Sequence, residues 1–228
     1  MPTELRPVSI DAMARRLRQM PLSIRDAISP AIEYEMEKGG AFTSEATDVI
    51  YIGPQSVTGI GPFSIVLGPA ATIKSLEDYE LYAEVQLPPQ LRELLCSFNG
   101  AVFYEMTIHS AHREINSSPS PFTMRHLPFS DFAFNFSISN NGERGINGNP
   151  EIASRRSSLD DWIRYFIMES GQISGWDTQT QAASAVWSDV ANWLYSEVTA
   201  AQVFRPVWKD AWLKADIPPV RRRRKKEA

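Results

Sequence analysis

Apolar side chains in the first forty residues recur at the spacing of two α-helices, one before Pro21 and one after it. The first run contains Ile10, Met13, Ala14, Leu17 and Met20, and the second contains Ile24, Ala27, Ile28, Ile32 and Met36. A period of three to four residues places the members of each run on one helical face. We therefore expect two helices over residues 9–39, with a kink at Pro30 and an end at the pair Gly39-Gly40.

Two short runs of β-branched and aromatic side chains follow, at residues 48–52 and 63–67. Gly-Pro pairs at 53–54, 61–62 and 68–69 bound them, and such pairs are turn signals. The two runs therefore predict two strands that form a hairpin.

Residues 87–100 predict a short amphipathic helix, and a strand directly after it. Pro88 and Pro89 suit a first helical turn. One face of the helix carries Leu87, Leu91, Leu94, Leu95 and Phe98. The pair Asn99-Gly100 can supply a left-handed C-terminal cap, and the β-branched and aromatic residues 102–108 then predict one strand.

The second half of the chain alternates strand and helix signals. Residues 132–138 carry an apolar side chain at every second position, which predicts a strand with one buried face. Further along, we expect a helix at 159–168, a strand at 171–177, a core helix at 184–198 and a short helix that carries Trp208 and Trp212. This order lacks a regular alternation of strand, helix and strand, so it predicts an α+β fold.

Composition indicates a folded globular protein. Of the 228 residues, 43% are hydrophobic and 11% aromatic, which is too apolar for a disordered chain. A single cysteine, Cys96, excludes an intrachain disulfide and a multi-cysteine zinc site. No apolar run approaches the ~20 residues of a membrane-spanning helix, and the N-terminus has no apolar region typical of a signal peptide. We therefore expect a cytoplasmic protein.

The formal net charge of −4 combines an acidic body with a basic tail. Residues 221–226 are all Arg or Lys and residue 227 is Glu, so residues 1–220 alone carry −9. An acidic body favours basic partners and suits nucleic-acid phosphates poorly. The tail is compatible with a solvated extension, a nuclear address, a nucleic-acid arm or a tether to a membrane surface.

The candidate catalytic and metal-binding groups form no recognised pattern. His109 and His112 are three residues apart, and residues three apart on a strand point to opposite faces. Cys96 lies within the helix predicted at 87–100, where a buried thiol is inert, and the chain has no G-x-S-x-G sequence. We therefore expect no enzymatic activity, no metal and no cofactor, with an enzyme of unfamiliar active site as the remaining alternative.

Two stretches of the chain contain short motifs in a recognisable order. Residues 87–95 read Leu-Pro-Pro-Gln-Leu-Arg-Glu-Leu-Leu and close on Asn99-Gly100, and Trp176-Asp177 precedes a polar turn and residues 185–194. This order resembles the SUKH superfamily of Smi/Knr-type proteins, over about residues 70–198. The resemblance implies a central, mainly antiparallel sheet backed by helices. It also implies a non-enzymatic binding role, most often as an immunity protein that neutralises a toxin.

The resemblance divides the chain into three parts. Residues 1–40 are an N-terminal helical extension, residues 41–200 a SUKH-like α+β domain, and residues 201–228 a short C-terminal helix with a disordered basic tail. The tail also defines an alternative function, a regulatory or structural scaffold that contacts nucleic acid through it.

The expected partner is a cognate toxin domain, with a nuclease as the leading class because nuclease clefts are basic. Trp176 and Asp177 are candidate contacts, since Trp is enriched at interface hot spots and Asp pairs with Arg. The alternative is structural: Trp176 buries its ring at the end of the sheet and Asp177 begins the turn, and the two roles are compatible. The acids that we expect the sheet to group around Trp176 are Glu143, Asp160, Asp161, Asp177 and Asp189.

Overall fold

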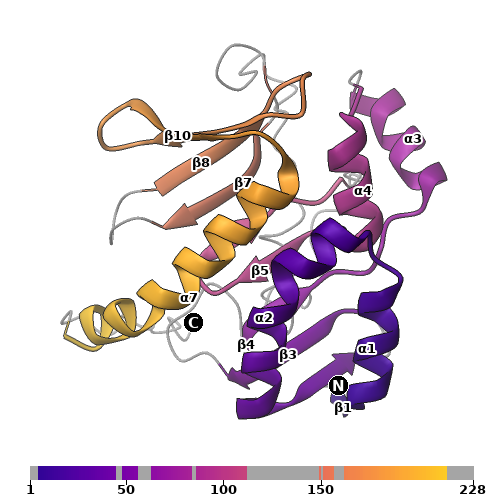
Figure 1. Cartoon of the computed structure of the whole chain (residues 1–228), viewed down its shortest axis with the longest axis vertical. Helices are drawn as coiled ribbons and strands as arrows, with labels where there is room; N and C mark the ends of the chain where they lie inside the picture. The colour runs from indigo at the N-terminus through magenta and orange to yellow at the C-terminus, as the bar shows by residue number, and fades with distance from the viewer. Residues whose placement is uncertain are drawn as a thin grey trace, which may run out of the picture.

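The fold is built on an antiparallel sheet whose ten strands, within the described residues, follow one another in chain order (Figure 1). The computed structural model describes residues 5–44, 48–55, 63–83, 86–111, 149, 151–156 and 162–214, without the side chains of residues 44, 55, 82, 83, 156 and 204–214. The strands are β1 (Leu5–Pro7), β2 (Ala41–Ser44), β3 (Ile50–Gln55), β4 (Phe63–Leu67), β5 (Ala101–Phe103), β6 (Met106–Ile108), β7 (Glu151–Arg156), β8 (Trp162–Ile167), β9 (Ile173–Asp177) and β10 (Ala182–Trp187). The helices are α1 (Ile10–Arg18), α2 (Leu22–Gly39), α3 (Ile73–Ala83), α4 (Pro89–Ser97) and α7 (Val190–Lys214). The predicted α+β class, with an antiparallel sheet backed by helices, is confirmed.

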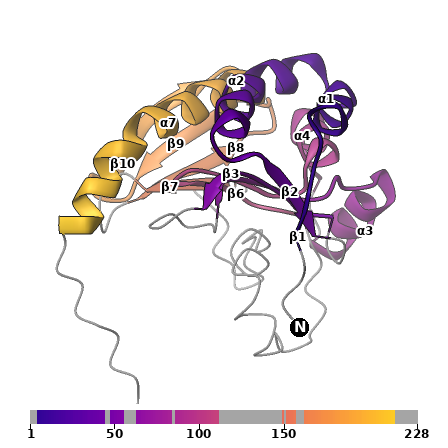
Figure 2. The ribbon, with the colours of Figure 1, turned by 90° about the horizontal axis from the view of Figure 1, so that it is seen from below.

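Helices α1, α2 and α7 cover one face of the sheet (Figure 2). The pairing register brings a row of residues across that face: Ile52, Ile65, Phe103, Met106, Arg155 and Ile163. Buried side chains of the helices, such as Met13, Ile28 and Trp193, belong to the same hydrophobic core as Ile65 and Phe103. The N-terminal helices therefore share the core of the sheet. On the other face a smaller buried cluster contains Val49, Tyr51, Val66 and Val102.

Several local predictions are confirmed. Two helices form over the N-terminal segment, and Pro30 lies inside the second. β3 and β4 pair antiparallel, as the predicted hairpin requires. The helix expected within residues 87–100 is α4, and Gly100 has the positive φ, 89°, that favours glycine.

The helix predicted over residues 159–168 is wrong, because Trp162–Ile167 is the strand β8. β8 pairs with β7 on one side and with β9 on the other. Tyr165 faces the helices and Phe166 faces away, and both are buried. An interior strand with apolar residues on both faces has no clean alternation, so its spacing also matched a helix.

The core helix predicted over residues 184–198 begins later than expected. Residues Ala182–Trp187 form β10, and α7 starts at Val190 and continues to Lys214. The short helix predicted around Trp208 and Trp212 is therefore the end of α7.

The strand predicted over residues 102–108 is two strands. β5 and β6 pair antiparallel across a tight turn at Tyr104, whose φ is +56°. The sequence patterns also missed β1, β2, β7 and α3. The strand predicted over residues 132–138 lies outside the described residues.

Glu197 brings a carboxylate from α7 into the core, where two side chains of the sheet contact it. Its side chain is only 7% exposed and accepts a hydrogen bond from Arg155 Nε at 2.6 Å. It also accepts a hydrogen bond from the Tyr165 hydroxyl. Burial, and then the nearby Glu197 charge, raises the pKa of Tyr165 far above its usual value, so the hydroxyl remains a donor.

Two indole rings pack against the ring of Tyr165. The ring of Trp193 lies 5.4 Å from that of Tyr165, and the ring of Trp187 lies 5.8 Å from it. Because the side chains of Arg155 and Glu197 are largely buried, water screens their ion pair poorly. The contacts of Glu197 with Arg155 and Tyr165 therefore fix α7 against β7 and β8.

Replacing Arg155 with Met should lower the free energy of unfolding by about 3–5 kcal/mol, because it leaves the buried Glu197 charge without its cation. The double variant R155M/E197L should lose less than R155M alone, since it leaves no buried charge. Urea unfolding followed by circular dichroism measures both. A double variant that is less stable than R155M would contradict this account.

Candidate functional site

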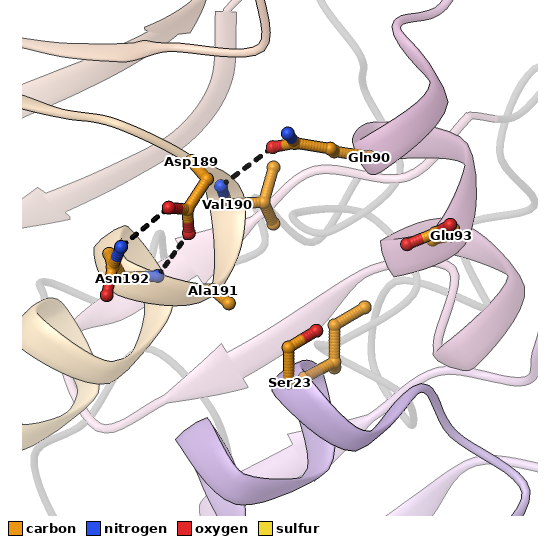
Figure 3. A pocket seen from close by; sticks show the side chains of 8 residues that line it. Ser23, Gln90, Glu93, Asp189, Val190, Ala191 and Asn192 are labelled. Carbon is orange, nitrogen blue, oxygen red and sulfur yellow. Dashed lines mark hydrogen bonds between the residues drawn. The ribbon is translucent and has the colours of Figure 1, made fainter.

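Three helices begin around one open groove of about 530 Å³ (Figure 3). The residues that line it are Ser23 and Ile24 of α2, Gln90 and Glu93 of α4, and Asp189, Val190, Ala191 and Asn192 at the start of α7. The groove therefore gathers segments that are far apart in the sequence. We call these eight residues the helix-start groove.

Asp189 caps the first turn of α7. Its Oδ1 accepts a hydrogen bond from the backbone N–H of Asn192 at 2.8 Å, and its Oδ2 accepts one from Ser188 Oγ at 2.7 Å. The bond from the Asn192 backbone, more than any other contact, lowers the pKa of Asp189, so the groove holds an ionised carboxylate at neutral pH.

Gln90 connects α4 to the start of α7. Its Oε1 accepts a hydrogen bond from the Val190 backbone N–H at 3.1 Å, as Figure 3 shows. The turn between β8 and β9 leaves no room behind this side chain, because a Cβ placed on Gly171 would lie 3.1 Å from Gln90 Cδ. The hydrogen bond with Val190 and the close approach of Gly171 therefore both restrict the position of Gln90, which connects α4 to the start of α7.

Proline starts the other two helices. The N-caps of α2 and α4 are Pro21 and Pro88, and neither provides a side-chain hydrogen bond to the helix. Their ring geometry suits helix entry without a polar cap. The polar side chains that α2 and α4 present to the groove are therefore residues within the helices, Ser23, Gln90 and Glu93, and not their N-caps.

Exposed acidic and apolar side chains lie at or next to the lining residues along the three helices, and we call them the rim of the groove. Leu22 is 62% exposed and Tyr195 is 56% exposed, and each lies within one helical turn of a lining residue. Glu93 is exposed, and Asp26, one turn beyond Ser23, forms a 3.4 Å ion pair with Arg25. An aromatic and an aliphatic side chain amid carboxylates suit binding of a basic protein surface.

Asp177 has a structural role in the turn between β9 and β10. Its Oδ1 accepts hydrogen bonds from the backbone N–H groups of Gln179, at 2.8 Å, and Thr180, at 3.1 Å. Trp176 is partly buried and lies in register with Arg164 and Ala183, on the face away from the helices.

The register does not bring Asp189 to Trp176 and Asp177. Asp177 pairs with Ala182, whereas Trp187, two residues before Asp189, pairs with Ile173. The two pairs are four positions apart along β9, which corresponds to about 13 Å at the usual rise of a strand. The expected grouping around Trp176 is therefore wrong for Asp189. Glu143, Asp160 and Asp161 lie outside the described residues.

The sequence patterns missed Ser23, Gln90, Glu93 and Asn192. Gln90 lies inside the stretch recognised as a helix, but its bond to Val190 joins residues 100 positions apart. The only available signal was that each of the three predicted helices has a polar residue in its first turn. This pattern is common in helices and points to no particular contact.

Of the candidate metal-binding and thiol groups, His109 and Cys96 are among the described residues and His112 is not. No group of three or more His, Cys, Asp or Glu side chains among the described residues is arranged to hold a metal ion. Burial raises the pKa of Cys96 and so favours the neutral thiol. His109 is buried, and that burial lowers its pKa.

Comparisons with family models, with curated proteins and with solved structures find no match to the chain. Among the helices that the structure describes, none has the length and hydrophobicity needed to cross a membrane.

Replacing Asp189 with Ala should lower the free energy of unfolding by about 1 kcal/mol through loss of the helix cap. Asp189→Asn should lose less, because the amide oxygen can still accept. The folded-state pKa of Asp189 is below its ordinary value of 3.8, so the carboxylate contributes its full stabilisation above that pH and loses it progressively as the pH falls from there through the folded-state pKa. Urea unfolding at pH 7 and pH 3 should show the D189A deficit shrinking at pH 3. An equal deficit at both would exclude an electrostatic cap.

Proposed function

We propose that this chain is a non-enzymatic, cytoplasmic protein-binding domain of the immunity type, which neutralises a cognate toxin by covering its active site or substrate entrance. The helix-start groove and its rim form the central contact. The observation that carries the proposal is the combination there of the carboxylates Glu93 and Asp189 with exposed Leu22 and Tyr195.

The side chains that line the groove support binding rather than catalysis. They supply two carboxylates, two amides and one hydroxyl, and the eight lining residues include no His, Cys or Lys. Among the lining residues, Ser23 forms no hydrogen bond with either carboxylate, and hydrogen bonds keep Asp189 ionised with its oxygens occupied by helix donors. Such a set attracts cations and donors but lacks a nucleophile with its base.

The motifs that resemble the SUKH superfamily build the frame of this groove. The Leu-Pro-Pro stretch becomes α4, whose Leu91, Leu94 and Leu95 are buried while Gln90 and Glu93 face the groove. Asn99 follows α4 and holds the chain after β6, because its side chain bonds both the N–H and the C=O of Ala111, at 2.8 and 3.0 Å. A role for these motifs in shaping a binding surface is consistent with membership of that superfamily.

The negative charge of residues 1–220 supports a basic partner such as a nuclease. Residues 1–220 carry a formal charge of −9, and the groove concentrates carboxylates at an exposed rim. Attraction between opposite fields speeds association, while desolvated aromatic and aliphatic anchors slow dissociation. Leu22 and Tyr195 are the anchors in this interface.

The test is co-expression with the toxin domain encoded beside the gene for this chain. We expect co-expression to restore growth and the two purified domains to bind. The variant D26K/E93K should slow association by about tenfold or more at low salt and by much less at high salt, because screening removes the steering field.

A matched control carries the same charge change elsewhere. E77K/D78K replaces two exposed acids of α3, which do not line the groove, and should leave the association rate nearly unchanged at moderate salt. Deletion of residues 221–228 should preserve binding. Loss of binding on tail deletion, with no effect of D26K/E93K, would instead support the scaffold that contacts nucleic acid through its tail.

A further inference from the structure

Among the strands that the structure describes, β10 is at one edge of the sheet. Its pairing partner in the sheet is β9, and it ends the strand order. Residues 182–186 are all exposed, and Val186 is 58% exposed. In Figure 1, β10 lies at the margin of the sheet, on the opposite side from α3. An edge strand presents backbone N–H and C=O groups that can pair with a further strand.

The two edges of the sheet differ in how they are protected. β1, at the other end of the strand order, has three residues and contains Arg6 and Pro7. Proline, charge, short length and β-bulges are the usual means of blocking an edge, and of these β10 has only the register shift between Ala183 and Ala185. β10 has six residues, Ala-Ala-Ser-Ala-Val-Trp, with no proline, glycine or charge. Its small side chains leave the backbone accessible.

The chain segment that contains β10 carries acidic side chains and no basic one. Residues 165–204 contain Glu169, Asp177, Asp189 and Glu197 but no Lys, Arg or His. Asp177 pairs with Ala182 at one end of β10, and Asp189 follows its other end. Arg164, in the same register row as Ala183, lies two strands further in and forms an ion pair with Glu151.

These charges oppose pairing with a second copy of the chain. Antiparallel pairing of two β10 strands would bring the Asp177 end of one copy toward the Asp189 end of the other. The register of β10 also shifts between Ala183 and Ala185, so each strand carries an irregularity that a rigid copy would have to match. A basic segment is not repelled by these acids, and a flexible extended segment can adjust to the register shift as a rigid copy cannot.

We propose that β10 binds an extended, basic segment of the partner protein as an eleventh strand of the sheet. The inference deepens the proposed function and rests on it for the identity of the partner. β10 ends at Trp187, two residues before the lining residue Asp189, so the chain passes from this edge directly to the helix-start groove. Main-chain hydrogen bonds supply the pairing, and the acids at both ends select for positive charge.

The experiment uses the full chain and three synthetic ten-residue peptides in which Val and Thr alternate with Lys, Glu or Ser. Fluorescence anisotropy measures binding, and amide hydrogen exchange measures protection of residues 182–187. We expect the Lys peptide to bind about tenfold more tightly than the Glu peptide at low salt and to slow exchange in β10.

Two substitutions of Val186, to Lys and to Glu, place opposite charges at the same position of the edge. V186K should weaken the Lys peptide by about threefold and V186E should strengthen it by a similar factor, as expected for an exposed charge pair. L81K is the control, because Leu81 is 82% exposed on α3 and lies away from β10. Melting temperatures near that of the original chain establish that the variants fold.

Equal binding of the three peptides, equal effects of V186K and L81K, or no protection of β10 would overturn the proposal. A dimer that V186K dissociates would overturn it in favour of a second copy. Toxin neutralisation that survives V186K and V186E unchanged refutes the role of the edge but not the immunity function. Peptide binding without any toxin neutralisation refutes the immunity function but not the edge.

Discussion

The buried carboxylate of Glu197 is the constraint on which the arrangement of this fold depends. A charge in an apolar core is tolerated only beside a cation or several donors, so α7 must lie where Arg155 and Tyr165 reach it. That position sets the start of α7 against α4, where Gln90 accepts the Val190 N–H. The groove is thus a consequence of where one ion pair is buried.

The acidic residues of the groove differ in how much the stability of the fold depends on them. Asp189 is both a lining residue and the cap of α7, so a change there alters stability as well as surface charge. Glu93 lines the same groove but is exposed and has no such bond to a helix end. Glu93 and Asp26 can therefore be changed at little structural cost, whereas a change of Asp189 also affects the stability of α7.

The sequence predicted those elements whose signals are local. α4 has prolines at its start, leucines on one face and Gly100 after its end, and all of these signals act within about one dozen residues. β8 was predicted as a helix because its apolar side chains face both sides of the sheet, and only its pairing with β7 and β9 settles its backbone. The groove depends on contacts such as Gln90 with Val190, 100 residues apart, which no local spacing encodes.

In one long segment of the chain, every charged side chain is acidic. The segment from Tyr165 to Phe204 carries no basic side chain and includes the edge strand β10, the cap Asp189 and the first half of α7. Glu197 is neutralised within the core by Arg155, whereas Asp177 and Asp189 hold local backbone donors and keep their charge near the surface. Because those two carboxylates lie at opposite ends of β10, their field extends along an edge whose backbone groups are accessible. Position and charge therefore favour the same ligand at β10, an extended chain that brings its own cations.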